Sequence, residues 1–215
     1  SYPCTYRHPL CRYNFTTHEG FNAGIWKNDN ATDNQAATDY DKKWIPGQWK
    51  VPEAYDNPAS NDPWYFSTIR EANYFLETVV PRFEKGEIEG SETNIKHYIG
   101  EMYFLRAKNY LSKLETFGDF PIIKNTLPDE SESLIQASKR APRYKVAHFI
   151  LEDLDQAISL LTNNISGGKN RITKNAALLL KSRAALFEAS WLTYHKGTAL
   201  VPGGPGWPGK EKGAC

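Results

Sequence analysis

The sequence predicts an all-α fold of antiparallel helical hairpins, preceded by a long loop region that is rich in aromatic residues. Between residues 62 and 197, four segments carry apolar residues at three- and four-residue spacings, which is typical of amphipathic helices. Residues 1–61 show little helical periodicity but hold several tryptophans and tyrosines. Residues 198–215 form a loop whose glycines and prolines disfavour regular structure.

The loop region, residues 1–61, contains six glycines and prolines between Gly20 and Pro58, together with polar runs. Loops of this length without secondary structure are usually functional or disordered. Disordered segments are poor in aromatic residues. Because this segment is aromatic-rich, we expect it to be ordered and to pack on the helices.

The first predicted helix runs from Asp62 or Pro63 to Val80. Asp62 is a suitable N-cap residue and Pro63 a suitable first helical residue. Pro81 is expected to end the helix, because proline lacks the N–H that a helix interior needs. A charged turn with two glycines follows.

The second predicted helix begins at about Asn94, and we expect other helices to pack on it. Gly118 suits a left-handed helix end, and Pro121 prevents continuation. Arg106 is expected to form a buried or semi-buried structural pair, and Asp119 to cap or brace the turn after Gly118. The apolar stripe consists of Ile95, Ile99, Met102, Leu105, Tyr110, Leu114 and Phe117.

The third and fourth predicted helices follow a polar connection at residues 126–142. The third spans Tyr144–Thr162, and the fourth runs from an N-cap at Thr173 to about His195. We expect the first helix to pair with the second and the third with the fourth, as in an α-solenoid, although no strict 34-residue tetratricopeptide repeat is visible. Small residues are expected to let the fourth helix pack closely: Ala176, Ala177, Ala184, Ala185 and Ala189.

Composition excludes several function classes. The net charge is only +1, so no global charge attracts nucleic acid or an anionic membrane. There is no run of about 18 apolar residues that could span a membrane. No cysteine–histidine set has metal-site spacing, and no metal or cofactor is predicted. Cys4 and Cys11 could form a small-loop disulfide or remain free thiols; both interpretations stay open.

The candidate ligand site lies in the aromatic-rich loop region. Four of the six tryptophans occur in the first 64 residues, and three of these lie in the loop region. Indole rings can stack on the C–H faces of sugars or on bases, while neighbouring amides and carboxylates can bond hydroxyl groups. The alternative is that these tryptophans pin the loop onto the helices. The predicted binding residues are Trp26, Asp33, Asn34, Trp44, Gln48 and Trp49.

An enzyme is not predicted. A glycosidase would need a pair of carboxylates, and Asp33, Asp39, Asp41 and Glu53 lie in the aromatic-rich loop region, but no flanking motif marks any of them as an acid or a nucleophile. The sequence also contains no nucleophile-elbow, phosphate-loop, zinc-protease or dinucleotide-binding motif.

Several stretches, in order, resemble the SusD/RagB-like family of nutrient-binding outer-membrane lipoproteins. The resemblance covers residues 62–195, and the ordered set of motifs is more specific than any one of them. It is carried by Trp64-Tyr65 with Ile69, Ala72 and Asn73, by GEMYFLRA at 100–107, FGDFP at 117–121, Phe149-Ile150 with Asp153-Leu154, RITK at 171–174, and RAAL at 183–186 with Trp191.

This resemblance implies tetratricopeptide-like hairpins in a lipid-anchored, non-catalytic protein on the outward face of the outer membrane of Bacteroidetes. It implies that an oligosaccharide, or in some members a peptide, is bound for import through a TonB-dependent, SusC-like transporter. Family chains are usually at least twice as long, so we expect this sequence to correspond to the N-terminal half, without the signal peptide, the lipid anchor and the C-terminal part. An alternative hypothesis is a helical-repeat scaffold that binds a peptide or protein partner.

Overall fold

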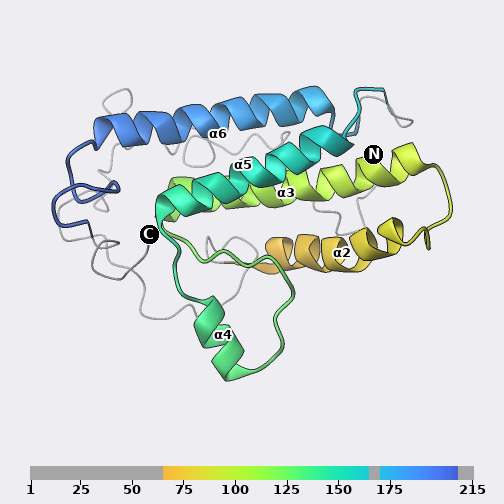
Figure 1. Cartoon of the computed structure of the whole chain (residues 1–215), viewed down its shortest axis with the longest axis horizontal. Coiled ribbons are helices and arrows are strands. Elements are labelled where there is room, and N and C mark those ends of the chain that lie inside the picture. Colours follow the sequence, from red (N-terminus) through yellow and green to blue (C-terminus); the bar gives the residue numbers. More distant parts are fainter. Residues whose placement is uncertain (1–64, 165–169, 208–215) are drawn as a thin grey trace, which may run out of the picture. The chain divides into compact units, whose positions relative to one another are not determined.

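The computed structural model describes residues 65–164 and 170–207. The chain divides into two compact units, Ser1–Ala59 and Ser60–Cys215, and all described residues belong to the second. The described residues contain one isolated β-bridge and five helices (Figure 1), namely α2 (Ser67–Glu84), α3 (Glu92–Phe117), α4 (Ser131–Ala137), α5 (Arg143–Leu160) and α6 (Lys174–Tyr194).

Helix α3 is the centre of the helical unit, as predicted. It packs against α2 on one side and against α5 on the other, while α5 also packs against α6 (Figure 1). The predicted hairpins α2–α3 and α5–α6 therefore both form, and the most extensive helix contact, between α3 and α5, joins them. The predicted all-α fold of helical hairpins is confirmed for the described residues.

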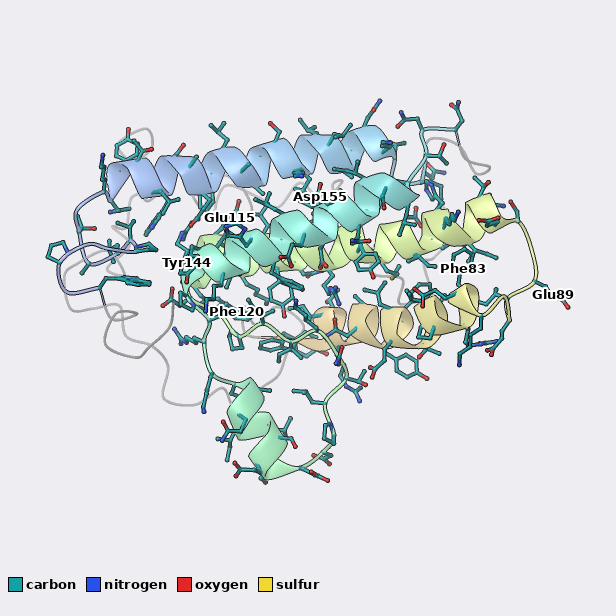
Figure 2. All side chains as sticks on the ribbon, viewed as in Figure 1. Phe83, Glu89, Glu115, Phe120, Tyr144 and Asp155 are labelled. Atoms are coloured by element: carbon teal, nitrogen blue, oxygen red, sulfur yellow. The ribbon has the colours of Figure 1, made fainter. Side chains whose placement is uncertain are left out.

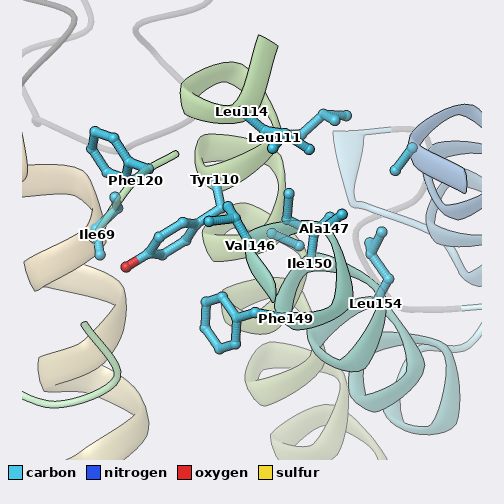
Figure 3. Packing of buried hydrophobic residues seen from close by; sticks show 12 residues of the cluster. Ile69, Tyr110, Leu111, Leu114, Phe120, Val146, Ala147, Phe149, Ile150 and Leu154 are labelled. Atoms are coloured by element: carbon cyan, nitrogen blue, oxygen red, sulfur yellow. The ribbon is translucent and has the colours of Figure 1, made fainter. Parts of the chain in front are cut away.

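The core is built around the aromatic side chains of α3 and its exit (Figure 3). Tyr110 is fully buried and meets the Phe149 ring edge-on, with ring centroids 4.9 Å apart. Phe120, also fully buried, stacks between Phe66 at 5.1 Å and Phe117 at 5.6 Å. Aromatic pairs at these distances contribute about 0.5–1.5 kcal/mol beyond the area they bury.

The predicted end of α3 is confirmed. Gly118 has φ +72°, a left-handed value that glycine adopts without a Cβ clash, and its N–H donates to the carbonyl of Leu114 at 3.0 Å. Phe120 and Ala141 then exchange two backbone hydrogen bonds, of 3.2 and 3.1 Å. These bonds close the base of the segment 120–141, which contains α4.

The first helix was predicted to include Tyr65 and Phe66, and this is wrong. Tyr65 and Phe66 are not helical, and α2 begins at Ser67. Phe66 packs its ring into the core against Phe120, and its carbonyl accepts the N–H of Arg70 at 2.8 Å. Phe66 therefore stays outside the helix, with its ring packed in the core.

The predicted stop at Pro81 is also wrong, because α2 continues through it to Glu84. Proline removes only its own N–H from the helical ladder, so later residues can still bond. The Lys85 N–H reaches the Pro81 carbonyl at 3.2 Å, and the Glu87 N–H reaches that of Arg82 at 2.9 Å. Near a helix end, one lost hydrogen bond does not break the last turn.

Two further expectations need correction. The segment 126–142 was expected to be a connection only, but it contains α4, a short helix with no buried residue and hence no apolar stripe to reveal it.

On α6, Ala177 and Ala184 are buried as expected, whereas Ala185 and Ala189 are exposed. One side of α6 packs on α5, and its other side is not covered by described residues.

Candidate functional site

The six predicted binding residues lie outside the described residues, so their arrangement stays a prediction. The described helices nevertheless show three buried charged clusters and two hollows. The clusters determine which polar groups are already bonded. The predicted residues are Trp26, Asp33, Asn34, Trp44, Gln48 and Trp49.

Arg106 and Asp153 form the first cluster, at the α3–α5 interface. Two guanidinium nitrogens each donate to one Asp153 carboxylate oxygen at 2.7 Å, and a third bond joins Arg106 to the Asn73 amide oxygen at 2.8 Å. The Asn73 amide donates in turn to the Ile123 carbonyl at 2.8 Å. Burial raises the pKa of the Asp153 carboxyl, and the Arg106 charge opposes that shift.

No polar side-chain atom of Arg106 or Asp153 is left without a hydrogen-bond partner within the described residues. The pair is thus a cross-brace between helices in which each side-chain nitrogen and oxygen already has a partner. The expectation that Arg106 makes a buried structural pair is confirmed.

Glu101 is the centre of the second cluster, which ties the turn after α5 to α3. It pairs with Arg171 and accepts the backbone N–H of Ile172 at 3.2 Å. The fully buried His97 lies 3.6 Å from Glu101 and accepts the Thr162 N–H at 3.2 Å through Nδ1. Burial lowers the pKa of His97, which therefore acts as a neutral acceptor.

Arg143 and Glu188 form the third cluster, between the start of α5 and the end of α6. Arg143 Nε donates to Glu188 Oε2 at 2.8 Å, and its guanidinium lies 4.1 Å from the centre of the Trp191 ring. The backbone N–H of Arg143 donates to Asp119 at 2.8 Å, so Asp119 braces the start of α5 from the turn after Gly118.

The third cluster is incompletely bonded. Arg143 Nη2, Glu188 Oε1 and Trp191 Nε1 are buried but have no hydrogen-bond partner within the described residues. Burial raises the pKa of the Glu188 carboxyl against the opposing influence of Arg143. Unbonded buried polar groups are rare, and they often mark a place for water or a ligand.

Beside this cluster lies an open hollow of about 860 Å³, which we call the α5–α6 hollow. The loop 197–207 forms its outer wall, while Tyr144, His148, Leu192 and Lys196 complete its lining. The ring of Trp207 lies 6.2 Å from that of Tyr144, with 53° between the ring planes. Figure 2 shows Tyr144 at the start of α5, at the end of the molecule where this loop leaves α6.

A second hollow, of about 360 Å³, lies between α2, the segment 121–127 and α4. Phe66, Ile69, Ile123, Leu127 and Leu134 give it a mainly apolar lining. Its polar lining residues are Arg70, Asn73, Asn125 and Ser138, of which Asn73 is already bonded to Ile123 and Arg106. This hollow therefore offers mainly shape and apolar contact.

Comparison with known proteins identifies the family. Residues 13–186 match the SusD-like family described as "Starch-binding associating with outer membrane". The chain belongs to the SusD-like family. No curated protein sequence matches the chain.

Solved SusD-like proteins are similar to parts of this chain. A SusD-like protein from Bacteroides fragilis is 30% identical, with a TM-score of 0.51 over 62% of this chain and 25% of its own. A laminarin-binding SusD-like protein is 24% identical, with a TM-score of 0.46 over 55% of this chain and 24% of its own. A SusD-like carbohydrate-binding protein from Bacteroides vulgatus is 20% identical, with a TM-score of 0.46 over 59% and 27%. The matched part of this chain thus spans about a quarter of each of these three proteins.

The SusD-like motifs of the sequence have structural roles in the described helices. GEMYFLRA places Glu101 and Arg106 in two of the buried clusters, and FGDFP supplies the helix end, the brace at Asp119 and the core ring of Phe120. Within the described residues no group of acidic, cysteine and histidine side chains could hold a metal, and no helix is long and apolar enough to cross a membrane.

Sequence reasoning missed the residues of the α5–α6 hollow. A signal was present for one of them, because Trp207 is a tryptophan in a glycine- and proline-rich loop, the same pattern that singles out Trp44 and Trp49. Tyr144 and Glu188 gave no such signal, since each lies on a predicted amphipathic helix. Only the fold brings them together with Trp207.

Proposed function

We propose that this protein is a non-catalytic glycan-binding protein of the cell surface, which captures oligosaccharide for import. The supporting observation is the match of residues 13–186 to a family described as starch-binding and associated with the outer membrane. The matched range includes the tryptophan-bearing loop region as well as the helices. The closed bonding of Arg106 with Asp153 supports a rigid frame on which a binding loop can be held.

The proposal includes a location and a partner. The protein is held by a lipid anchor on the outward face of the outer membrane, and it passes its cargo to a TonB-dependent, SusC-like transporter. Purification of the tagged protein from cross-linked outer membranes tests this. We expect a transporter barrel to copurify, and a preparation without any barrel protein counts against the partnership.

The binding residues of this proposal are the six named in the loop region. Trp26, Trp44 and Trp49 would stack on sugar rings, and Asp33, Asn34 and Gln48 would bond hydroxyl groups. Each stacking contact contributes about 1 kcal/mol. At about 1.4 kcal/mol per tenfold change, the loss of one ring should weaken binding about fivefold.

Isothermal titration calorimetry on the full protein, after a glycan-array screen that includes maltoheptaose, tests binding and its site. We expect binding in the micromolar to millimolar range and a weakening of about fivefold for each of Trp44→Ala and Trp49→Ala. Binding to no glycan of the array overturns the proposed function. Binding that is unchanged in both variants overturns this site assignment alone.

The absence of catalysis is tested separately. Incubation of the protein with the oligosaccharide that it binds should release no reducing sugar. Release that is lost when Asp33, Asp39, Asp41 or Glu53 is changed to the amide would reassign the protein as a glycosidase.

A scaffold for a peptide or protein partner is the second candidate, favoured by the uncovered side of α6. Leu179 is 73% exposed and Leu186 69% exposed there, within the described residues. A peptide found by mass spectrometry in the protein purified from cells would support this function. Purified protein that carries glycan and no peptide would count against it.

A further inference from the structure

We propose that the α5–α6 hollow is a subsite for one sugar ring of the bound glycan, with Tyr144 and Trp207 as its stacking platform and Arg143 with Glu188 as its polar floor. This assignment rests on the proposed function and adds a contact region beyond the six loop residues. Three observations carry it: two adjacent aromatic rings in the wall, a size suited to a ligand, and buried polar groups left unbonded beneath.

The aromatic rings belong to two separate elements that meet at the hollow. Tyr144 lies in the first turn of α5, and Trp207 ends the described part of the loop 197–207. Both are half-buried, so each side chain is held by neighbours and still presents some of its surface. Because their planes are inclined by 53° with centroids 6.2 Å apart, they form two angled surfaces instead of one closed stack.

The wall that carries Trp207 is held in place by the close approach of its own backbone. A Cβ on Gly204 would lie 1.7 Å from the Thr198 carbonyl oxygen, so only glycine fits there. The Gly204 N–H donates to the Val201 carbonyl at 3.1 Å, and the Trp207 N–H donates to that of Gly204 at 3.2 Å. Trp207 is therefore placed by a turn with its own hydrogen bonds.

The volume of the hollow, about 860 Å³, falls in the range of about 300–1,000 Å³ that is usual for ligand sites. His148 and Lys196 line it and are exposed, so both can bond hydroxyl groups at its rim. Next to it lies a crevice of about 20 Å³, which shares Tyr144, Leu192 and Trp207 with the hollow. A space of about 10–15 Å³ admits one water, so one hydroxyl group fits this crevice.

The crevice is lined by Arg143 and Glu188, and each has one unbonded polar atom. Their side chains are only 9% and 10% exposed, so bulk water does not satisfy these atoms. A hydroxyl group can accept from the Arg143 guanidinium or donate to the Glu188 carboxylate. An alkyl group can do neither, and a carboxylate ligand has no proton to donate to Glu188. The chemistry therefore favours a neutral, polyhydroxylated ligand.

The hollow near α4 provides the internal contrast. Its lining is mainly apolar, and none of its lining residues has a buried polar side-chain atom without a hydrogen-bond partner within the described residues, unlike Arg143 and Glu188. The same glycan should not depend on residues there. A change in that hollow can serve as a second control for effects on the fold.

Calorimetry on the full protein tests the subsite, with maltoheptaose or the array glycan that binds the wild type most tightly as the probe. We expect Trp207→Ala and Tyr144→Ala each to weaken binding about fivefold. Glu188→Gln presents an amide where the carboxylate was, and the loss of a charge-assisted bond should weaken binding about tenfold. Tyr194→Ala is the matched control, because Tyr194 is an aromatic residue of α6, 87% exposed and outside the hollow lining.

A second measurement is made on the wild type and uses one conservative variant only to assign a signal. In the wild type, the Trp207 indole N–H signal, assigned by its loss in Trp207→Phe, should shift when the glycan is added, and the shift should saturate at the affinity found by calorimetry. Glycan binding with an unshifted signal and unchanged affinity in all three hollow variants overturns the subsite while the proposed function stands. No glycan binding by the wild type overturns both. A crystal soaked with the glycan tests the role of Arg143 and Glu188. If the Trp207 signal shifts but the crystal shows only a water molecule in the crevice, these two residues do not bind the sugar.

Discussion

Among residues 65–164 and 170–207, two buried arginine–carboxylate pairs cross helix interfaces, and they differ in how completely they are bonded. Arg106 and Asp153, between α3 and α5, share two hydrogen bonds and have no unbonded polar atom within the described residues. Arg143 and Glu188, between α5 and α6, share one and leave an unbonded atom on each side. The first pair lies at the most extensive helix contact, and the second lines the crevice next to the α5–α6 hollow.

We interpret the contrast as a division of roles: the Arg106–Asp153 pair stabilises the helices, and the Arg143–Glu188 pair contributes to the proposed ligand site. A buried charge is tolerated when all its hydrogen bonds are made, and the pair then joins helices firmly. A buried charge with an unbonded atom is costly, and the cost falls when a ligand or water supplies the missing partner. The two pairs should therefore respond differently to mutation.

The largest effect is expected for Arg106→Met. It leaves the Asp153 charge buried and unpaired, so the free energy of unfolding should fall by about 3–5 kcal/mol. Urea denaturation followed by circular dichroism measures this. The double variant Arg106→Met with Asp153→Leu should recover most of the loss, because it removes both charges together. A loss below about 1 kcal/mol in the single variant would contradict the role of this pair as a brace.

A smaller effect is expected for Arg143→Met. The pair that it breaks has one hydrogen bond between its side chains and is already incompletely bonded, so we expect a loss of about 1–3 kcal/mol by the same measurement. Replacing both partners, Arg143→Met with Glu188→Leu, should at least restore wild-type stability. Should Arg143→Met cost more than Arg106→Met, the distinction between the two pairs would be lost.

Tyr110→Phe probes the fully bonded region without removing a charge. The Tyr110 hydroxyl accepts the Ile123 N–H at 2.8 Å and donates to the Ile123 carbonyl at 3.2 Å, and burial raises its pKa to about 12. Its removal leaves a buried N–H unpaired, which should cost about 1–2 kcal/mol. Tyr74→Phe, at a residue that is 64% exposed, is the matched control and should change stability by less than about 0.5 kcal/mol. Equal effects would show that the Ile123 bonds are not stabilising.

The smallest effect is a pH dependence at the Glu101 cluster. The pKa of His97 is lower in the folded chain than its ordinary value of 6.5, so below pH 6.5 the unfolded state binds more protons at this residue. The stability contributed by neutral His97 is present above pH 6.5 and falls as the pH drops below it. His97→Gln cannot titrate, so the stability difference between wild type and variant should shrink between pH 7.5 and 5.5. A difference that stays constant would show that His97 does not titrate differently on folding.

The helices could be predicted from the sequence because their apolar stripes repeat locally, as in Ile99, Leu105, Tyr110 and Leu114. Their ends were less predictable: Phe66 leaves the helical pattern because it fits the core beside Phe120. Helix α4 escaped prediction because none of its residues is buried. The burial of Arg106 could be foreseen, but its partner Asp153 lies 47 residues away and only the packing of α3 on α5 selects it.

The candidate hollow was less predictable still. Tyr144 and Trp207 come from distant parts of the sequence, and neither the angle between their rings nor the unbonded atoms beneath them has a sequence signature. The ordered motifs, in contrast, identified the family, because FGDFP and GEMYFLRA are fixed by the core that they build. Motifs of this kind identify a frame, and a ligand site on that frame has to be found by its chemistry.

The two hydrogen bonds between Phe120 and Ala141 have a consequence for how this frame can vary. They bring the ends of the segment 120–141 together next to the core ring of Phe120, so everything between them is an excursion from the helical stack. Because its two ends are held together by these hydrogen bonds, the segment between them can change in length or composition while the four long helices stay in place. Residues 129–138, with no buried side chain, are therefore the natural position for inserting a fluorescent or affinity label.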